Sequence, residues 1–400
     1  MTTLTFIDLF CGIGGFHQAL VNLKYKCVFA CDIDNNCRET YFKNYGIKPE
    51  GDICQVDILK IPKFDILCGG FPCNSFSKAG FQKGLEDTRG TLFFNICEIV
   101  KVHKPKYMIL ENVKNLVTNN NGHTWGIIMK SIDELGYITY TDPLILNVLH
   151  FNIPQNRERV IILCKRKDIL LSLPDLPFIP KTTEAKLKLT KFIKDIIIPE
   201  EHNNKNNKLS NKMKKVSEVW SEFIKIMITN KIEIPKIPLW SDWFDIDLSH
   251  NNHDNTFYLK YKNWIDKNIL FYNTNISVLQ TWLIKSRNIP EWSGAVRKFE
   301  WQAGSQLSDD NLDNLLWSAR GSGIRVKRPN YIPTLVAMSM IPVYKSRYLG
   351  SKELLKLQSF PDNFQFDEKN IFKQIGNAVN VKMIERCADF LINGQELFIT

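Results

Sequence analysis

A cysteine beside a proline is the first feature of this chain whose type and position suggest chemistry. Cys73 follows Pro72 in a glycine-bounded stretch, residues 69–77, which comes directly after the apolar run 64–68. A thiolate is a strong nucleophile, and amide donors in a loop at a strand end can favour the ionised form. A lone cysteine is more commonly a small core residue. The residues that accompany Cys73 favour an attacking group.

A carboxylate and two arginines lie at the ends of other apolar runs. Glu111 ends a run that begins at Tyr107, and Arg157 and Arg159 precede the run 160–164. If the strands before Cys73 and Glu111 are parallel, their carboxyl ends meet at one edge of the sheet. Taken singly, each of these charged residues is typical of an exposed strand end. Together with Cys73 they predict covalent catalysis.

Short apolar runs alternate with helical patterns in the first part of the chain, and these elements would position the reactive groups. The expected strands are 6–10, 27–31, 64–68, 107–110 and 160–164. Residues 16–23 and 125–135 have the apolar spacing of helices between them. This alternation predicts an α/β fold with a doubly wound, mostly parallel sheet.

A second loop, residues 8–16, contains three glycines at the point where the first strand gives way to a helix. Glycines there let the backbone approach a ligand closely, although their spacing departs from the dinucleotide pattern and a structural tight turn remains the alternative. Asp32 ends the second strand, and Asp52 with Ile53 follows Gly51. Acidic residues in successive loops favour a cofactor that carries a nucleoside, since ribose hydroxyls donate to carboxylates.

Composition indicates two domains in this chain of 400 residues. Glycine is absent from residues 137–293, whereas eight of the nine tryptophans lie between Trp220 and Trp317. We expect a catalytic and cofactor-binding domain of residues 1–195 plus 371–400. Residues 196–370 would form a smaller domain, in which most of the aromatic residues belong to the core.

Charge and cysteine content limit the class of protein. The formal net charge is +10, which suits a polyanionic partner such as nucleic acid. The apolar runs are of strand length, and the first residues do not resemble a signal peptide. The ten cysteines include no Cys-x-x-Cys pair, so we expect reduced thiols in an intracellular, cytoplasmic protein.

In order along the chain, several short motifs resemble those of C5-cytosine-specific DNA methyltransferases of bacterial type II restriction-modification systems. The resemblance covers residues 5–165 and 325–400. Its motifs are residues 8–16, 69–77, 87–92, 111–113, 155–159, 357–362 and 376–379. Asn74 departs from the glutamine that is common in the family, and Lys352 and Lys356 stand where arginines are usual. These departures concern contacts with DNA or between domains.

The resemblance implies a Rossmann-like fold and a methyl transfer from S-adenosylmethionine to cytosine in double-stranded DNA. The Cys73 thiolate would add to C6 of a flipped-out cytosine, while Glu111 hydrogen-bonds N3 and the exocyclic amine. Arg157 and Arg159 would favour the thiolate, or hold the base carbonyl or a phosphate. Residues 77–89 would close over the nucleotide.

The resemblance also implies two sets of binding residues. The expected cofactor-binding residues are Phe10, Gly12, Ile13, Gly14, Gly15, Asp32, Ile33, Asp52, Ile53, Pro72, Leu92, Asn377, Ala378 and Val379. The expected DNA-binding residues are Asn74, Ser77, Arg89, Arg320, Arg325, Lys327 and Arg328, the last four in a basic segment that follows the tryptophan-rich region. We expect a monomer with no metal and no membrane partner.

Two other functions fit parts of the same pattern. An RNA methyltransferase of the tRNA-modifying branch would share the catalytic motifs, but the long stretch between Arg159 and Arg325 argues against it. A DNA-binding regulator without catalysis could use the same scaffold, and the presence of both Cys73 and Glu111 disfavours it. The recognition sequence and the base that removes the C5 proton do not follow from these residues.

Overall fold

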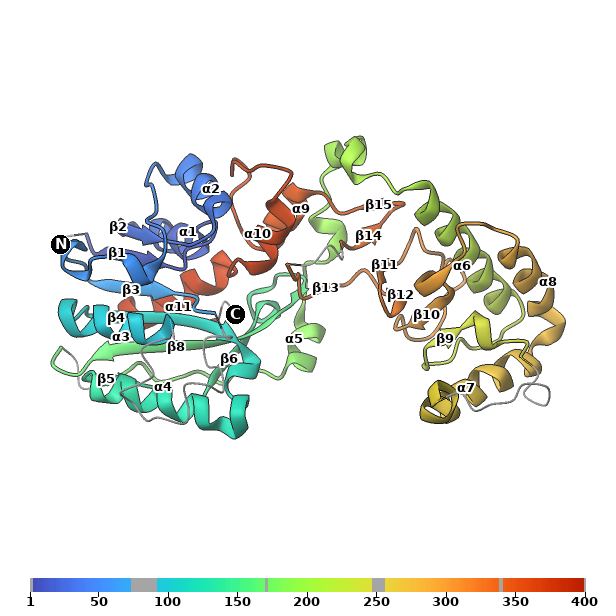
Figure 1. Cartoon of the computed structure of the whole chain (residues 1–400), viewed down its shortest axis with the longest axis horizontal. Helices are drawn as coiled ribbons and strands as arrows, with labels where there is room; N and C mark the ends of the chain where they lie inside the picture. Colours follow the sequence, from blue (N-terminus) through green and yellow to red (C-terminus); the bar gives the residue numbers. More distant parts are fainter. Residues whose placement is uncertain (1–2, 73–91, 170–171, 247–255, 338–340, 399–400) are drawn as a thin grey trace. The chain divides into compact units, whose positions relative to one another are not determined.

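The computed structural model describes residues 3–72, 92–169, 172–246, 256–337 and 341–398 (Figure 1). The chain divides into two compact units: residues 1–192, 333–339 and 351–400 form the first, and residues 193–332 and 340–350 form the second. Residues 333–339 and 351–370, which we expected in the second domain, group with the first unit. Gln358 and Gln365 illustrate the reason, since both hydrogen-bond to backbone or side-chain groups elsewhere in the first unit.

A seven-stranded sheet organises the first unit, with six strands in the order β2-β1-β3-β4-β8-β5 and β6 paired with β8. The strands are β1 (Thr5–Leu9), β2 (Lys26–Cys31), β3 (Ile66–Gly69), β4 (Tyr107–Val113), β5 (Tyr137–Thr139), β6 (Leu144–Asn147) and β8 (Glu158–Arg166). Strands β2, β1, β3 and β4 are parallel, and β8 pairs antiparallel with β4, β5 and β6. All strands of this sheet except β8 therefore run in one direction, which confirms a mostly parallel sheet.

Helices cover both faces of this sheet, as a doubly wound fold requires. The helices of the first unit are α1 (Gly15–Asn22), α2 (Asn35–Tyr45), α3 (Leu92–His103), α4 (His123–Glu134), α5 (Thr182–Lys188), α9 (Ser351–Leu357), α10 (Ile371–Asn377) and α11 (Val381–Asn393). Ile7 and Leu9 of β1 pack in one core with residues of α3 and α4. Phe6 contacts His17 of α1 on the opposite face, where α1 packs against α11.

The antiparallel pairing of β4 with β8 brings the carboxyl end of β4 next to the amino end of β8. In the β4–β8 pairing, Val113 lies opposite Arg159 and Glu111 lies opposite Ile161. An antiparallel pair places the carboxyl end of one strand beside the amino end of the other. Residues that follow β3 and β4 and residues that begin β8 therefore gather at one edge.

The second unit contains a six-stranded sheet with the order β15-β14-β11-β12-β10-β9. Its strands are β9 (Leu239–Trp240), β10 (Lys298–Trp301), β11 (Leu316–Arg320), β12 (Gly323–Lys327), β14 (Val343–Tyr344) and β15 (Arg347–Tyr348), and its helices are α6 (Asn211–Thr229), α7 (Thr256–Thr274) and α8 (Ile276–Arg287). The short strands β7 (Gln155–Asn156) and β13 (Ile332–Pro333) lie outside the two large sheets.

Many aromatic residues of the second unit lie in its core, as expected from the sequence. Trp220, Trp282, Trp292 and Trp317 are each at most 1% exposed. Trp220 stacks on Phe299 with the ring centroids 4.3 Å apart. Burial of several large rings removes much apolar surface from water, which is the main stabilising contribution to such a core.

Candidate active site

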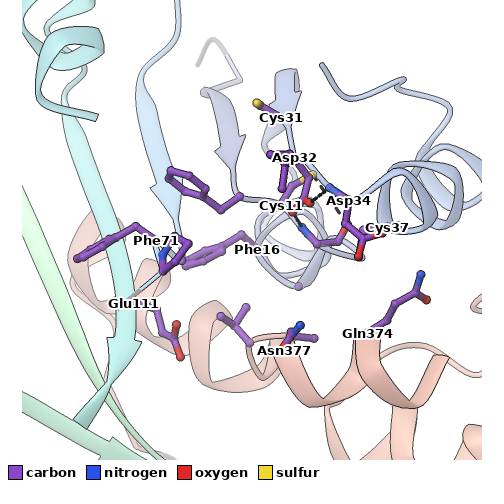
Figure 2. Close-up of a pocket in the computed structure, with 18 of the residues that line it drawn as sticks. Cys11, Phe16, Cys31, Asp32, Asp34, Cys37, Phe71, Glu111, Gln374 and Asn377 are labelled. Atoms are coloured by element: carbon purple, nitrogen blue, oxygen red, sulfur yellow. Dashed lines mark hydrogen bonds between the residues drawn. The ribbon is translucent and has the colours of Figure 1, made fainter. Parts of the chain in front are cut away.

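A pocket of about 490 Å³ lies in the first unit, at the carboxyl ends of β1, β2, β3 and β4. Strand order reverses direction along the chain at β1, and such switch points are where open α/β sheets bind ligands. The predicted residues that line it are Phe10, Gly12, Gly15, Asp32, Ile33, Asp52, Ile53, Pro72, Leu92, Glu111, Arg157, Arg159, Asn377, Ala378 and Val379. Figure 2 shows Glu111 and Phe71 toward one end of the pocket and Asp34, Cys37 and Gln374 toward the other.

The glycine loop after β1 depends on close packing. A Cβ on Gly15 would lie 2.6 Å from Cγ2 of Val379 and 2.8 Å from its carbonyl oxygen. Gly14 has φ +88, and a Cβ there would strike the ring of Tyr45. Ile13, which is buried, and Gly14 do not line the pocket, so their role in this structure is to shape the loop.

Asp32 links the glycine loop to the start of α2. Its Oδ2 accepts a hydrogen bond from the Gly12 amide at 2.8 Å, and its Oδ1 accepts one from the Asp34 amide at 2.8 Å. Burial raises the pKa of Asp32, while these amide donors oppose that rise. Each carboxylate oxygen retains a second lone pair. Asp32 can thus hold the loop and still accept a hydrogen bond from a ligand.

An ion pair between Glu111 and Arg159 occupies the sheet edge. Nε of Arg159 lies 2.8 Å from Oε1 of Glu111, and both side chains are about nine-tenths buried, with exposures of 12% for Arg159 and 10% for Glu111. The next residue, Asn112, donates from Nδ2 to the carbonyl of Phe71 at 2.7 Å. Strand β4 therefore supplies the carboxylate and also anchors the chain one residue before Pro72.

Four predicted site residues, Cys73, Asn74, Ser77 and Arg89, lie outside the described residues, as does the predicted closing segment 77–89.

Arg157 has surroundings unlike those expected for a residue that contacts the base. Its side chain is buried, with 1% exposure, and its Nη1 and Nη2 atoms donate to the backbone carbonyls of Leu335, Gly376 and Ala378. Burial lowers the pKa of Arg157 to about 9, so it stays protonated at neutral pH. The terminal nitrogens are therefore engaged by the protein itself. In this arrangement Arg159 carries the contact with Glu111.

Among the described residues, Cys11, Cys31 and Cys37 line the pocket, but they are poor nucleophiles. Burial raises the pKa of Cys31 and of Cys37 to about 12, and the Asp32 carboxylate adds to the effect. Burial raises the pKa of Cys11 as well. A protonated thiol does not attack carbon at neutral pH, so these three groups serve as pocket wall.

Gln374 is a pocket residue that the sequence analysis missed. Its side chain is 4% exposed, and Oε1 accepts a hydrogen bond from Oγ1 of Thr40 at 3.3 Å. Nε2 is buried and has no hydrogen-bond partner among the described residues. Its neighbour Lys373 pairs with Asp34 at 3.0 Å. In the sequence, Gln374 could have been noticed because it stands two residues before Gly376 and three before the predicted site residue Asn377.

The four predicted DNA-binding residues of the second unit differ from one another in the groups that they contact. Arg325 forms an ion pair with Glu300 at 2.7 Å, and Lys327 lies over the ring of Tyr331, 3.9 Å from its centroid. Arg328 bonds to Asp310 and to the carbonyls of Ala303 and Ser305. Arg320 is half-buried and its Nε donates to Ser318 at 3.3 Å. Arg328 is thus engaged within its own unit.

Among the residues that the structure describes, none of the helices combines the length and apolar character needed to cross a membrane.

The chain is similar to known proteins over its full length. The profile of the family described as "C-5 cytosine-specific DNA methylase" matches residues 4–393. Type II methyltransferase M.NlaIV of Neisseria lactamica is 31% identical, with 98% of this chain and 100% of that protein covered. Type II methyltransferase M.BanI of Aneurinibacillus aneurinilyticus is 30% identical, with 99% and 97% covered.

Other relatives match over a shorter region at higher identity. Type II methyltransferase M.HhaI of Haemophilus parahaemolyticus is 46% identical over 200 residues, which are 50% of this chain and 58% of that protein. The match with several relatives of this kind spans only about half of their length.

Solved structures show the same fold at low identity. S. pombe Dnmt2 methyltransferase has a TM-score of 0.51 at 16% identity, covering 98% of this chain and 99% of that one. Entamoeba histolytica methyltransferase EhMeth has a TM-score of 0.54 at 13% identity, covering 98% and 99%.

Proposed function

The chain belongs to the C-5 cytosine-specific DNA methylase family, and from this premise we propose that it methylates C5 of a cytosine in a specific double-stranded DNA sequence. The methyl donor would be S-adenosylmethionine, and the setting a type II restriction-modification system. The observation that carries the proposal is the buried Glu111–Arg159 ion pair in a pocket that Pro72 also lines. Cys73 follows Pro72 directly in the sequence.

The pocket residues fit S-adenosylmethionine. Asp32 has lone pairs to accept from ribose hydroxyls, and the buried Nε2 of Gln374 is a donor that needs an acceptor. Ile33 is 75% exposed at the pocket edge and can cover a flat ring. The glycine-loop end carries Asp32 and Asp52, which suits a cationic ligand better than a phosphate. S-adenosylmethionine supplies an activated methyl group on a positively charged sulfur.

The protein groups would activate a base that is a weak nucleophile by itself. The target must leave the DNA stack, at a cost of a few kcal/mol. The Cys73 thiolate then adds to C6, and Glu111 offsets the charge that develops on the ring by hydrogen bonding at N3 and the exocyclic amine. Arg159 orients Glu111. After the methyl group is on C5, loss of the C5 proton lets the C6–sulfur bond break and releases Cys73.

The first prediction concerns the covalent intermediate. A pool of random duplexes in which 5-fluorocytosine replaces cytosine should give a denaturation-resistant protein–DNA adduct when S-adenosylmethionine is present, because fluorine blocks the elimination step. Cys73→Ala should give no adduct. Cys54→Ala removes an exposed thiol and should react as the wild type does. The readout is a shifted band in a denaturing gel.

Two outcomes contradict the proposal. An adduct that persists in Cys73→Ala excludes this nucleophile. Methyl transfer to tRNA but not to duplex DNA, measured in parallel with labelled donor, favours the RNA methyltransferase alternative. Mapping the methylated cytosines of a mixed DNA library then identifies the recognition sequence.

A further inference from the structure

The turn between α10 and α11 presents buried carbonyl groups that need partners. Helix α10 ends at Asn377, and residues 375–378 form what we call the carbonyl turn. The last carbonyls of a helix have no partner within it, and they carry a partial negative charge. Gly376 and Ala378 are buried, so water cannot readily satisfy them. Two side chains from distant parts of the sequence bond to these carbonyls.

Arg157 supplies the first set of donors. Nη1 donates to Leu335 at 2.8 Å and to Gly376 at 3.1 Å, and Nη2 donates to Gly376 at 3.2 Å and to Ala378 at 2.8 Å. The Arg157 amide is itself held by Oδ1 of Asn147 at 3.1 Å. A planar guanidinium can span these carbonyls, whereas the single nitrogen of a lysine cannot.

Gln358 supplies the second set from the segment after α9. Its side chain has no measurable exposure, and Nε2 donates to Ile375 at 2.9 Å and to Ala378 at 3.3 Å. Its own backbone carbonyl accepts from the Val381 amide at 2.9 Å, at the start of α11. The two donors meet at Ala378. Arg157 and Gln358 therefore both hold the carbonyl turn by hydrogen bonds.

Two residues next to these bonded carbonyls line the cofactor pocket. Asn377 and Val379 line the cofactor pocket, and Val379 is the residue that contacts Gly15 of the glycine loop. Arg157 is two residues before Arg159, which pairs with Glu111. Residues 157–159 thus contact both the turn that lines the cofactor pocket and the Glu111 carboxylate.

We propose that Arg157 and Gln358 are positioning residues that clamp the carbonyl turn so that Asn377 and Val379 shape the cofactor pocket. In this role Arg157 does not act on the base. It connects the carbonyl turn to the segment that carries Arg159, the partner of Glu111. The choice of ligand in the test below rests on the proposed function. The clamp itself rests only on the contacts of the first unit.

The test separates cofactor binding from catalysis. We expect Arg157→Lys and Gln358→Met each to raise the Kd of S-adenosylhomocysteine by about tenfold, as titration calorimetry measures it, because lost hydrogen bonds free the turn. The effects should be less than additive in the double variant, since both side chains hold Ala378. Arg159→Lys should slow methyl transfer. The control for binding is Arg166→Lys, at the other end of β8 and outside the pocket lining, which should leave this Kd within about twofold of wild type.

Hydrogen exchange provides a readout that needs no ligand and remains valid if the wild type binds no S-adenosylhomocysteine. The amides of residues 376–381 should exchange faster in Arg157→Lys and in Gln358→Met than in the wild type, while those of β1 keep their protection. Unchanged Kd and exchange in Gln358→Met overturn the clamp. So does an Arg157→Lys enzyme that binds the ligand normally but forms the 5-fluorocytosine adduct slowly. Loss of thermal stability with both readouts unchanged indicates a structural role alone and also overturns it.

Discussion

At the scale of single residues, the pocket is defined by polar groups with little freedom. Asp32 accepts from two backbone amides, and Glu111 is held by Arg159. Gln374 is different, because Thr40 fixes its oxygen while its buried nitrogen has no partner among the described residues. A buried donor without an acceptor destabilises the free protein. A ligand that brings an acceptor to this nitrogen gains affinity from removing that cost.

Gln374→Leu should therefore weaken cofactor binding. The side chains are similar in size, and the bond from Thr40 is lost from the free and the bound protein alike. The loss in affinity is therefore that of one hydrogen bond to the ligand, which is worth about 1 kcal/mol, or roughly five- to tenfold in Kd. Calorimetric titration with S-adenosylhomocysteine measures the change. The matched control is Gln55→Leu, since Gln55 is an exposed glutamine of the same unit that does not line the pocket. Equal affinities for the two variants would show that Gln374 makes no contact with the ligand.

At the scale of elements, the pocket is the place where the start of α1 meets the turn before α11. The two helices pack along one face of the sheet, and the contact at Gly15 and Val379 leaves no room for a methyl group. Gly126 offers a contrast, because it lies inside α4 and a Cβ placed there would have no atom within 4 Å. The same substitution should have opposite effects at these two glycines.

Gly15→Ala should lower the free energy of unfolding by about 1–3 kcal/mol, as overpacking of a well-packed contact does. It should also weaken S-adenosylhomocysteine binding, because Val379 must move. Gly126→Ala should instead stabilise the protein by about 0.5–1 kcal/mol, since alanine loses less entropy in a helix than glycine. Chemical denaturation of both variants tests this. A Gly15→Ala protein as stable as Gly126→Ala would refute the close packing.

At the scale of the whole molecule, ionisation inside the first unit links its stability to pH. His17 is 5% exposed, stacks on Tyr45, and its Nδ1 lies 2.6 Å from the Tyr41 hydroxyl. Burial lowers the pKa of His17 to about 3. The folded protein therefore keeps this ring neutral under conditions where an unfolded chain, with a pKa near ~6.5, binds a proton. Acid should favour the unfolded state.

The sign of this effect is testable. Between about pH 6.5 and pH 3, His17 should reduce the free energy of unfolding by up to ~1.4 kcal/mol per pH unit as the pH falls. His17→Gln removes the titration, so its stability deficit relative to wild type should shrink from pH 7.5 to pH 5.5. Scanning calorimetry can follow the transition that shifts with S-adenosylhomocysteine, which belongs to the first unit. A deficit that is constant with pH would mean that folding leaves the pKa of His17 unchanged.

The sequence alone was enough to predict what depends on local pattern. Alternating strands and helices, the glycine loop, Asp32 and Glu111 each follow from the periodicity of short segments and from residue types at strand ends. The structure gathers Asp32, Asp52, Glu111 and Asn377 around one pocket, as expected. The position and contacts of Cys73 remain predictions.

Only the tertiary structure decided which long-range contacts those residues make. Arg157 and Arg159 look alike in sequence, yet one bonds to carbonyls up to 221 residues away and the other to Glu111. The contacts of Gln358 and Gln374 likewise form only when residues 351–400 pack against the rest of the first unit. The physical reason is that local periodicity decides whether a segment becomes a strand or a helix, whereas the groups that a side chain meets are set by packing between elements far apart in the chain.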